Sequence, residues 1–243
     1  MDHLALGRMM EEIHKRDDAD QDLLLKFEWN FLPALLHGHD DVCLDRIYSQ
    51  LSKVPSFFVD LLTFLYKPDD GDDEETDTDE AIRGANASRA FHLFYHWDKI
   101  PYVSQEGVVD VQGLTDWVKE ALIIAKEKKR IIAAYIQLGG LFAHYGEDGE
   151  HASDLFSIME TIDSTLFFNN YRVGLFNKRG YTVRAPYEGG EIERGNEFFF
   201  KDLHERYHVQ YPKVAKVFKD LAVEYAEMAK QMDEEADLTK LDY

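Results

Sequence analysis

The sequence holds a single cysteine, Cys43, among 243 residues, so an internal disulfide is excluded. Disulfides mark oxidising compartments, and nothing here indicates one. The first ten residues lack the apolar core of a secretory signal peptide. No apolar run approaches the roughly 20 residues that a helix needs to cross a bilayer. We therefore predict a cytoplasmic protein without a membrane partner.

Basic residues are also scarce, with 27 Lys and Arg against 47 Asp and Glu and a formal net charge of -20. Binding to a nucleic-acid backbone or to an anionic membrane needs cationic surface, so the composition disfavours both as general functions. The acidity favours solubility. It is also compatible with an acidic mimic of nucleic acid, which would occupy a basic groove on another protein.

The alternating pattern of β-strands is not found, and helical spacing dominates. Leu23, Phe27, Phe31 and Leu35 recur at four-residue spacing. Pro33 lies inside this pattern, and we expect it to kink or restart the helix because proline removes a backbone donor. Further helices are predicted at about 41–53, 55–66, 85–100, 114–130, 131–145, 152–161, 163–176, 190–208 and 212–236.

These segments predict an all-α protein, an array of about ten helices in antiparallel pairs that resembles an irregular helical repeat. Residues 69–80 are almost all acidic or small, and such a charged run offers nothing to bury. We place a flexible acidic loop at 67–83, between an N-terminal helical part at 1–66 and a main helical part at 84–243, within one continuous domain. Calcium binding is an alternative for this loop, although it lacks the residue order of an EF-hand.

One basic segment stands out in this acidic chain. No acidic residue occurs between Ser164 and Tyr187, and several glycines there permit close backbone approach. Such a segment before a helix can bind a phosphate, a nucleic-acid strand or a carboxylate. The alternative is that its cations pair with acids nearby in sequence, namely Glu188, Glu191 and Glu193. The residues predicted to contact an anion or a partner are Lys178, Arg179, Arg184 and Arg194.

The same segment carries a resemblance. Residues 174–184, Gly-Leu-Phe-Asn-Lys-Arg-Gly-Tyr-Thr-Val-Arg, are similar to a segment near the C-terminus of large, poorly characterised, helix-rich bacterial proteins. The likeness extends over roughly 25–236. It implies a helical C-terminal module of a multidomain bacterial protein, from anti-phage or other conflict systems. The family carries no established catalytic residues to transfer.

A metalloprotease-like string lies further along, at His204-Glu-Arg-Tyr-His208. In zinc proteases of the HExxH type the two histidines hold Zn²⁺ and the glutamate, here Glu205, activates the bound water. Glu224 or Glu227 on the next helix would be a third ligand. Arg206 departs from the pattern, because those enzymes usually carry uncharged residues there. The structural alternative is a surface helix that buries a stripe of Phe199, Leu203 and Tyr207.

Two other histidine groups are weaker signals. Residues 37–43 contain two histidines and Cys43, three zinc-type donors without a clear fourth, so a turn is the simpler interpretation. His92 and His96 share one helix face. Phe91 and Tyr95 beside them predict that this helix packs against a neighbour.

The sequence thus favours a non-enzymatic helical interaction module, related to bacterial defence, that binds a protein or nucleic-acid partner and needs no cofactor. Changing Lys178 and Arg179 to glutamate should then abolish binding and leave the fold intact. The alternatives are a zinc-dependent hydrolase using His204, Glu205 and His208, and an acidic nucleic-acid mimic.

Overall fold

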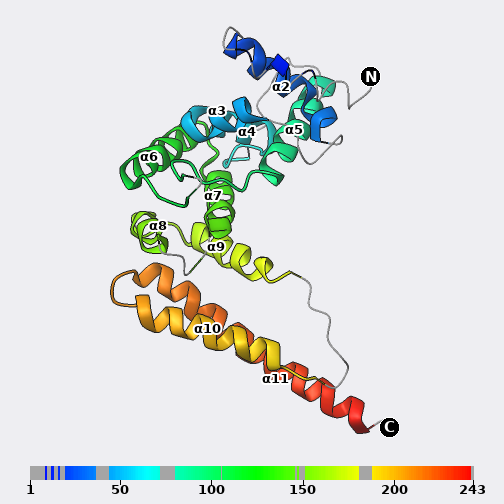
Figure 1. The fold of residues 1–243 in the computed structure, drawn as a ribbon, viewed down its shortest axis with the longest axis vertical. Coiled ribbons are helices and arrows are strands. Elements are labelled where there is room, and N and C mark those ends of the chain that lie inside the picture. The colour runs from blue at the N-terminus through cyan, green and yellow to red at the C-terminus, as the bar shows by residue number, and fades with distance from the viewer. Residues whose placement is uncertain are drawn as a thin grey trace. The chain divides into compact units, whose positions relative to one another are not determined.

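The computed structural model describes residues 20–36, 44–71, 80–104, 106–145, 147, 151–180 and 188–241, together with 9, 12–13 and 16. Over these residues the chain forms ten helices and no β-strand, apart from one isolated antiparallel bridge between Val103 and Val109 (Figure 1). The all-α prediction is confirmed. None of the described helices combines the length and the apolar character that a bilayer span requires.

The contacts divide the chain into two compact units. Unit 1 lies within residues 1–102 and 112–134, and unit 2 within 103–111 and 135–243. The helices of the first half are α2 (Gln21–Leu36), α3 (Asp45–Lys53), α4 (Pro55–Leu65), α5 (Glu80–Tyr95) and α6 (Val111–Glu127). Those of the second half are α7 (Ile131–Tyr145), α8 (Ala152–Met159), α9 (Thr165–Lys178), α10 (Glu191–Tyr207) and α11 (Pro212–Leu241).

The core of unit 1 forms around Phe58 on α4. Pro55 is the first residue of this helix. Proline is tolerated there because the N–H groups of the first helical turn have no acceptor within the helix. The centroid of the Phe58 ring lies 5.7 Å from that of Phe94, 5.9 Å from Trp97 and 5.4 Å from Trp117. These separations fall in the range in which aromatic pairs attract beyond simple area burial. Unit 1 is therefore organised by one aromatic cluster.

Two buried charges hold helix ends in unit 1. Glu28 on α2 is fully buried and accepts the N–H of Ile47, in the first turn of α3, at 2.7 Å. A carboxylate is stabilised there because a helix N-terminus is electropositive. Arg130 is 2% exposed, and its guanidinium donates to the carbonyls of Tyr66 at 2.8 Å and Lys128 at 3.0 Å. Both charged groups therefore satisfy backbone groups that would otherwise be left unpaired.

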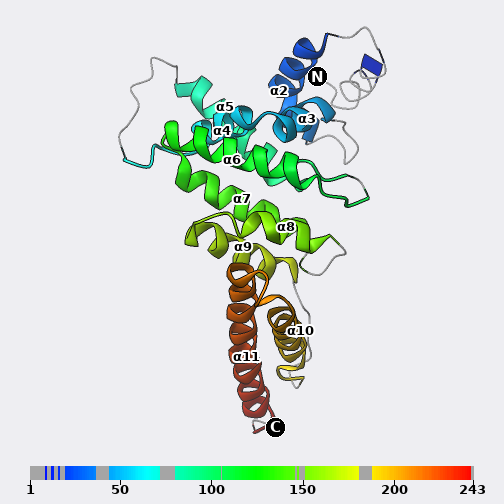
Figure 2. The same cartoon turned by 90° about the vertical axis from the view of Figure 1, so that its left-hand side faces the viewer.

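In unit 2, α10 and α11 form an antiparallel hairpin and lie side by side in both ribbon views (Figures 1 and 2). The ring of Phe200 on α10 lies 5.7 Å from Tyr225 and 6.2 Å from Phe218, both on α11. Phe156 of α8 approaches Phe218 at 5.7 Å and Tyr207 at 5.1 Å. The hairpin therefore packs one face onto α8 through aromatic side chains.

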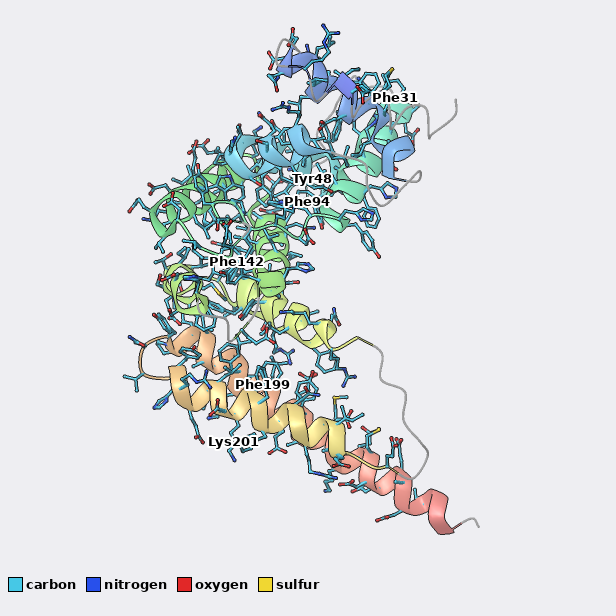
Figure 3. All side chains as sticks on the ribbon, in the orientation of Figure 1. Phe31, Tyr48, Phe94, Phe142, Phe199 and Lys201 are labelled. Carbon is cyan, nitrogen blue, oxygen red and sulfur yellow. The ribbon has the colours of Figure 1, made fainter. Side chains whose placement is uncertain are left out.

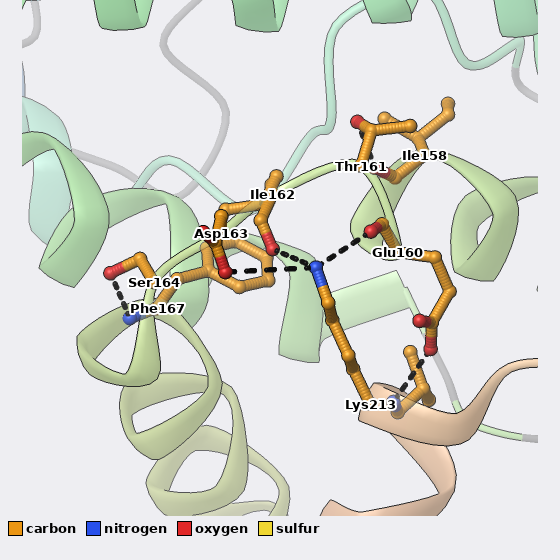
Figure 4. A network of polar contacts seen from close by, with 9 residues as sticks. Ile158, Glu160, Thr161, Ile162, Asp163, Ser164, Phe167 and Lys213 are labelled. Carbon is orange, nitrogen blue, oxygen red and sulfur yellow. Dashed lines mark hydrogen bonds and ion pairs between the residues drawn. The ribbon is translucent and has the colours of Figure 1, made fainter.

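A polar network joins the start of α11 to the segment after α8 (Figure 4). The ammonium of Lys213 donates to the carbonyl of Glu160 at 2.9 Å and to that of Ile162 at 3.0 Å. In return, the Glu160 carboxylate accepts the N–H of Val214 at 2.9 Å. Each helix end thus receives a charge of the sign that its dipole favours. This exchange orients the hairpin on α8.

Several helix boundaries differ from the sequence prediction. α2 continues through Pro33 without a restart. Pro33 lies in the last turn, where little helix remains to be disrupted, and the adjacent Leu32 is fully buried. α6 begins at Val111, earlier than the predicted start at 114.

The predicted helix at 85–100 is displaced towards the N-terminus. α5 begins at Glu80 and ends at Tyr95, so Trp97 lies beyond it, although its ring still joins the Phe58 cluster. Residues 80–83 of the predicted acidic loop are therefore helical, and residues 72–79 lie outside the described part of the chain. The two units also divide the chain at other positions than the predicted parts 1–66 and 84–243.

Candidate functional site

The basic segment begins at the C-terminal end of α9. Ser164 starts this helix by accepting the N–H of Phe167, and Arg179 follows its last residue. Gly180 has a φ of +64°, a left-handed conformation that side-chain-bearing residues rarely adopt. Residues 181–187, and with them Arg184, lie outside the described residues. The structure therefore places three of the four predicted contact residues.

Arg179 is enclosed by side chains of its own unit. Its guanidinium lies 4.5 Å from the ring of Phe176 and 5.8 Å from that of Tyr225, both cation–π distances. Its Nη1 lies 3.7 Å from Oε1 of Glu193, a carboxylate on α10 that is 1% exposed. Burial raises the pKa of the Tyr225 hydroxyl, and the positive charge of Arg179 opposes that rise. Arg179 thus acts as a clamp that joins α9, α10 and α11.

Lys178 and Arg194 also contact acids within unit 2. Nζ of Lys178 lies 3.0 Å from Oε2 of Glu147. Nη1 of Arg194 lies 2.5 Å from Oδ2 of Asp233 on α11, and this hydrogen bond raises the pKa of Arg194. The second oxygen of Asp233 accepts the N–H of Gly190 at 2.9 Å, at the start of α10. The Asp233 carboxylate therefore holds both the helix end and the arginine.

These contacts agree with the structural interpretation of the basic segment. Of the acids expected as partners, Glu193 pairs with Arg179, while Glu147 and Asp233 are distant in sequence from the cations that they meet. A partner's anion would have to compete with these internal carboxylates. The role of Lys178 and Arg194 in partner contact stays a prediction.

The contacts also change the expected result of the double glutamate substitution. A glutamate at position 179 would stand beside the buried carboxylate of Glu193, and two carboxylates in such a site repel each other. The expectation that Arg179→Glu leaves the fold intact is therefore inconsistent with the structure. Loss of binding in that variant would not distinguish a contact residue from a structural one.

The HExxH string begins in the last turn of α10 and ends at His208, the residue that follows the helix, and one nitrogen of each imidazole contacts a backbone carbonyl. Nδ1 of His204 lies 2.9 Å from the carbonyl of Ala215 on α11, and Nδ1 of His208 lies 2.9 Å from the carbonyl of Glu205. A carbonyl oxygen only accepts hydrogen bonds, so each Nδ1 carries the hydrogen. The ring centroids are 5.7 Å apart.

Within the described part of the chain, the structure places no third ligand of the kind that a zinc hydrolase needs beside these histidines. The carboxylate of Glu224 lies 2.6 Å from Arg172 of α9 and is engaged there. Over the described ranges, no group of three or more His, Cys, Asp or Glu side chains could hold a metal ion. The donors at 37–43 lie outside those ranges.

The buried stripe of α10 is shifted from the predicted one. Leu203 is fully buried as expected, but Phe200 takes the place predicted for Phe199, which is only half-buried. Phe200 gains this position because its ring stacks on Tyr225 at an interplanar angle of 5°. Tyr207 is half-buried against Phe156.

A shallow groove of about 260 Å³ runs between α10 and α11 on the outer face of the hairpin. Its floor is apolar and consists of Ala222, Val223 and Ala226 on α11. Val223 is 52% exposed, and Phe198, which follows the lining residue Glu197 in sequence, is 75% exposed. Charged and polar side chains form the rim: Glu197, Lys201, His204, Glu205 and Lys219. We refer to this feature as the hairpin groove.

Figure 3 shows Lys201 and Phe199 on opposite sides of α10, with Lys201 on the side of the hairpin groove. Sequence patterns alone do not reveal this groove. The available signal was Val223, an apolar residue among the exposed Lys216, Lys219 and Glu227 on the polar face of α11. Apolar residues are common on surfaces, so that signal has little weight until the structure places Val223 in a groove with Ala222 and Ala226.

A second exposed apolar feature lies on α5 in unit 1. The rings of Phe91 and Tyr95 stack with centroids 6.1 Å apart, and the two residues are 55% and 75% exposed. The helix does pack against a neighbour, α4, as expected, but these two rings stay exposed. The buried face of this helix instead carries Ala90 and Leu93.

Comparison with protein-family models, with curated proteins and with solved structures gave no significant match for this chain. The resemblance of residues 174–184 to a module of bacterial conflict proteins accordingly stays an expectation.

Proposed function

We propose that the chain is a non-enzymatic helical interaction module and that the hairpin groove binds a protein partner. The observation that supports this proposal is the 52% exposure of Val223 on an apolar floor that it forms with Ala222 and Ala226. Burying apolar surface contributes roughly 25 cal/mol of favourable free energy for each Å² removed from water. Exposed apolar side chains that line a groove therefore favour an interface. The opposite face of the hairpin is already packed on α8.

The occupant that fits this groove is an amphipathic helix of the partner. Two antiparallel helices present a channel into which a third helix can lay an apolar stripe. The rim carries acids, Glu197 and Glu205, and bases, Lys201 and Lys219, so the partner helix should flank its stripe with charges of both signs. A nucleic-acid backbone is a poorer fit, because its phosphates would meet the two rim carboxylates.

The test compares two matched valine substitutions in unit 2. Val223→Glu places a charge on the groove floor, and Val173→Glu places the same charge on the exposed face of α9, where the valine is 48% exposed against 52% for Val223. Both variants should melt within a few degrees of the parent, because neither valine is buried. Proteins captured from lysate of the native host are identified, and each is then purified and titrated against the three chains.

We expect a purified partner to bind the parent chain and Val173→Glu equally and Val223→Glu at least about tenfold more weakly, the effect of roughly 1.4 kcal/mol. Equal binding by all three chains would contradict the groove as the docking site.

The salt dependence of binding distinguishes the groove from the acidic-mimic alternative. A partner held by an apolar groove stays bound at high ionic strength, whereas a basic partner of an acidic mimic is released.

The finer parts of the functional hypothesis stay predictions. These are the association with bacterial defence, the cytoplasmic localisation, nucleic-acid contact through the basic segment, and the zinc-hydrolase alternative.

A further inference from the structure

A histidine pair lies at the C-terminal end of α10, with His204 in its last turn and His208 directly after it. We infer that His204 and His208 form a two-histidine chelate for one divalent transition-metal ion of the Cu²⁺, Ni²⁺ or Zn²⁺ class. This inference is independent of the proposed function and assigns no reaction to the ion. It differs from the zinc-hydrolase alternative, which requires a third protein ligand and a catalytic glutamate.

The spacing of the two rings suits one ion. Residues four apart lie on the same helix face, one turn above each other. Metal–nitrogen bonds to imidazole are about 2.0–2.1 Å, so two rings that share an ion have centroids within roughly 6 Å of each other. The observed separation of 5.7 Å lies within that reach.

The tautomers of His204 and His208 leave one ring nitrogen of each without a hydrogen, which is the form that binds a metal ion. Because the Nδ1 atom of each ring donates to a carbonyl, the lone pair of each neutral imidazole resides on Nε2. Metal-binding histidines commonly use one nitrogen for the ion and donate the other N–H to a carbonyl or carboxylate. For His204 the acceptor is Ala215 of the facing helix, so the ring orientation is held by the hairpin itself.

The charged neighbour within the string does not block the site. Arg206 lies between the histidines in sequence, but its guanidinium pairs with Asp202, one turn back on the same helix. It also lies over the ring of Tyr207, with the carbon of the guanidinium 5.8 Å from the ring centroid. These contacts direct its charge away from the histidines. Two protein nitrogens leave the remaining coordination positions to water, and among first-row divalent ions Cu²⁺ should bind most tightly.

The test is a calorimetric titration of untagged, metal-free protein with Cu²⁺ in a weakly coordinating buffer. All proteins carry His3→Ala, because a histidine at the third position of a chain chelates Cu²⁺ together with the terminal amine. The variants are His208→Ala, whose exposed side chain contributes little to packing, and the control His92→Ala/His96→Ala, the other histidine pair of this spacing in the sequence.

We expect a Cu²⁺ site in the His3→Ala protein that is retained in the His92/His96 control and weakened at least about tenfold in His208→Ala. Electron paramagnetic resonance should show two equatorial nitrogens before the His208 substitution and one after it. Unchanged affinity in His208→Ala would overturn the inference, as would loss of the site in the control. Neither outcome bears on the groove, because the titration contains no partner.

Discussion

Arg179 lies 3.7 Å from Glu193, and the carboxylate of Glu193 is 1% exposed. The guanidinium nitrogen in this contact is itself buried and makes no hydrogen bond to the described residues. The pair is thus an ion pair inside unit 2, placed between α9 and α10. It gives the basic segment a structural role in addition to any role in binding.

Replacing Arg179 by methionine should destabilise the protein. The Glu193 carboxylate would lose the attraction of the Arg179 cation while it stays buried, and removing one member of a buried interaction with a charged group costs about 1–3 kcal/mol or more. Lys178→Met is the matched control, because its pair with Glu147 is more exposed and such pairs contribute about 0–1 kcal/mol. Urea unfolding of both variants measures the difference. Equal midpoints would contradict the clamp.

Gly190 and Gly195 provide a test in which the same substitution has opposite signs. A Cβ at Gly190 would lie 2.2 Å from the carbonyl oxygen of Ala229, so Gly190→Ala must push α10 away from α11 and should cost about 1–3 kcal/mol. A Cβ at Gly195 meets nothing within 4 Å. Gly195→Ala should therefore stabilise α10 by about 0.5–1 kcal/mol, because alanine loses less backbone entropy. Thermal unfolding distinguishes the two directions, and a stabilised Gly190→Ala would refute the close approach.

The raised pKa of Tyr48 predicts that the folded state loses stability at alkaline pH. Burial, assisted by the negative charge of Asp98, raises the pKa of Tyr48 from 10.0 to about 12. Between these values the unfolded chain has lost the phenolic proton and the folded chain has kept it. Stability is therefore complete below pH 10 and falls as the pH rises towards 12.

The variant Tyr48→Phe removes this titration, so its stability should fall less than that of the parent over the same pH interval. Tyr95→Phe serves as the comparison, because Tyr95 is 75% exposed on α5. The measurement is the unfolding midpoint at a series of alkaline pH values. Parallel curves for the parent and Tyr48→Phe would show that burial does not hold the Tyr48 proton.

Helix positions were the part of the fold that could be predicted well. The bounds of α7, Ile131–Tyr145, agree with the prediction, because a run of lysines precedes it and a glycine follows it. The error at α5 has a tertiary cause. Trp97 continues the aromatic pattern past the helix end, since its ring is required by the Phe58 cluster and not by the helix.

The candidate sites could be predicted only in part. The string at 204–208 was visible, and its spacing implies that both histidines share a face. The hairpin groove was not, because its two walls come from different helices and its floor is three small or medium apolar residues. Such residues are ordinary on one helix and become significant only where a second helix forms the other wall of a groove.

The sequence by itself determined the all-α class, the approximate helices and the concentration of basic residues between Ser164 and Tyr187, because these follow from local spacing and composition. Only the tertiary structure decided which acid each cation meets. Lys178 pairs with a glutamate 31 residues away, and Arg194 with an aspartate 39 residues away. Such pairings, like the orientation of His204 by Ala215, depend on how helices pack, and packing is not encoded in the spacing of any one segment.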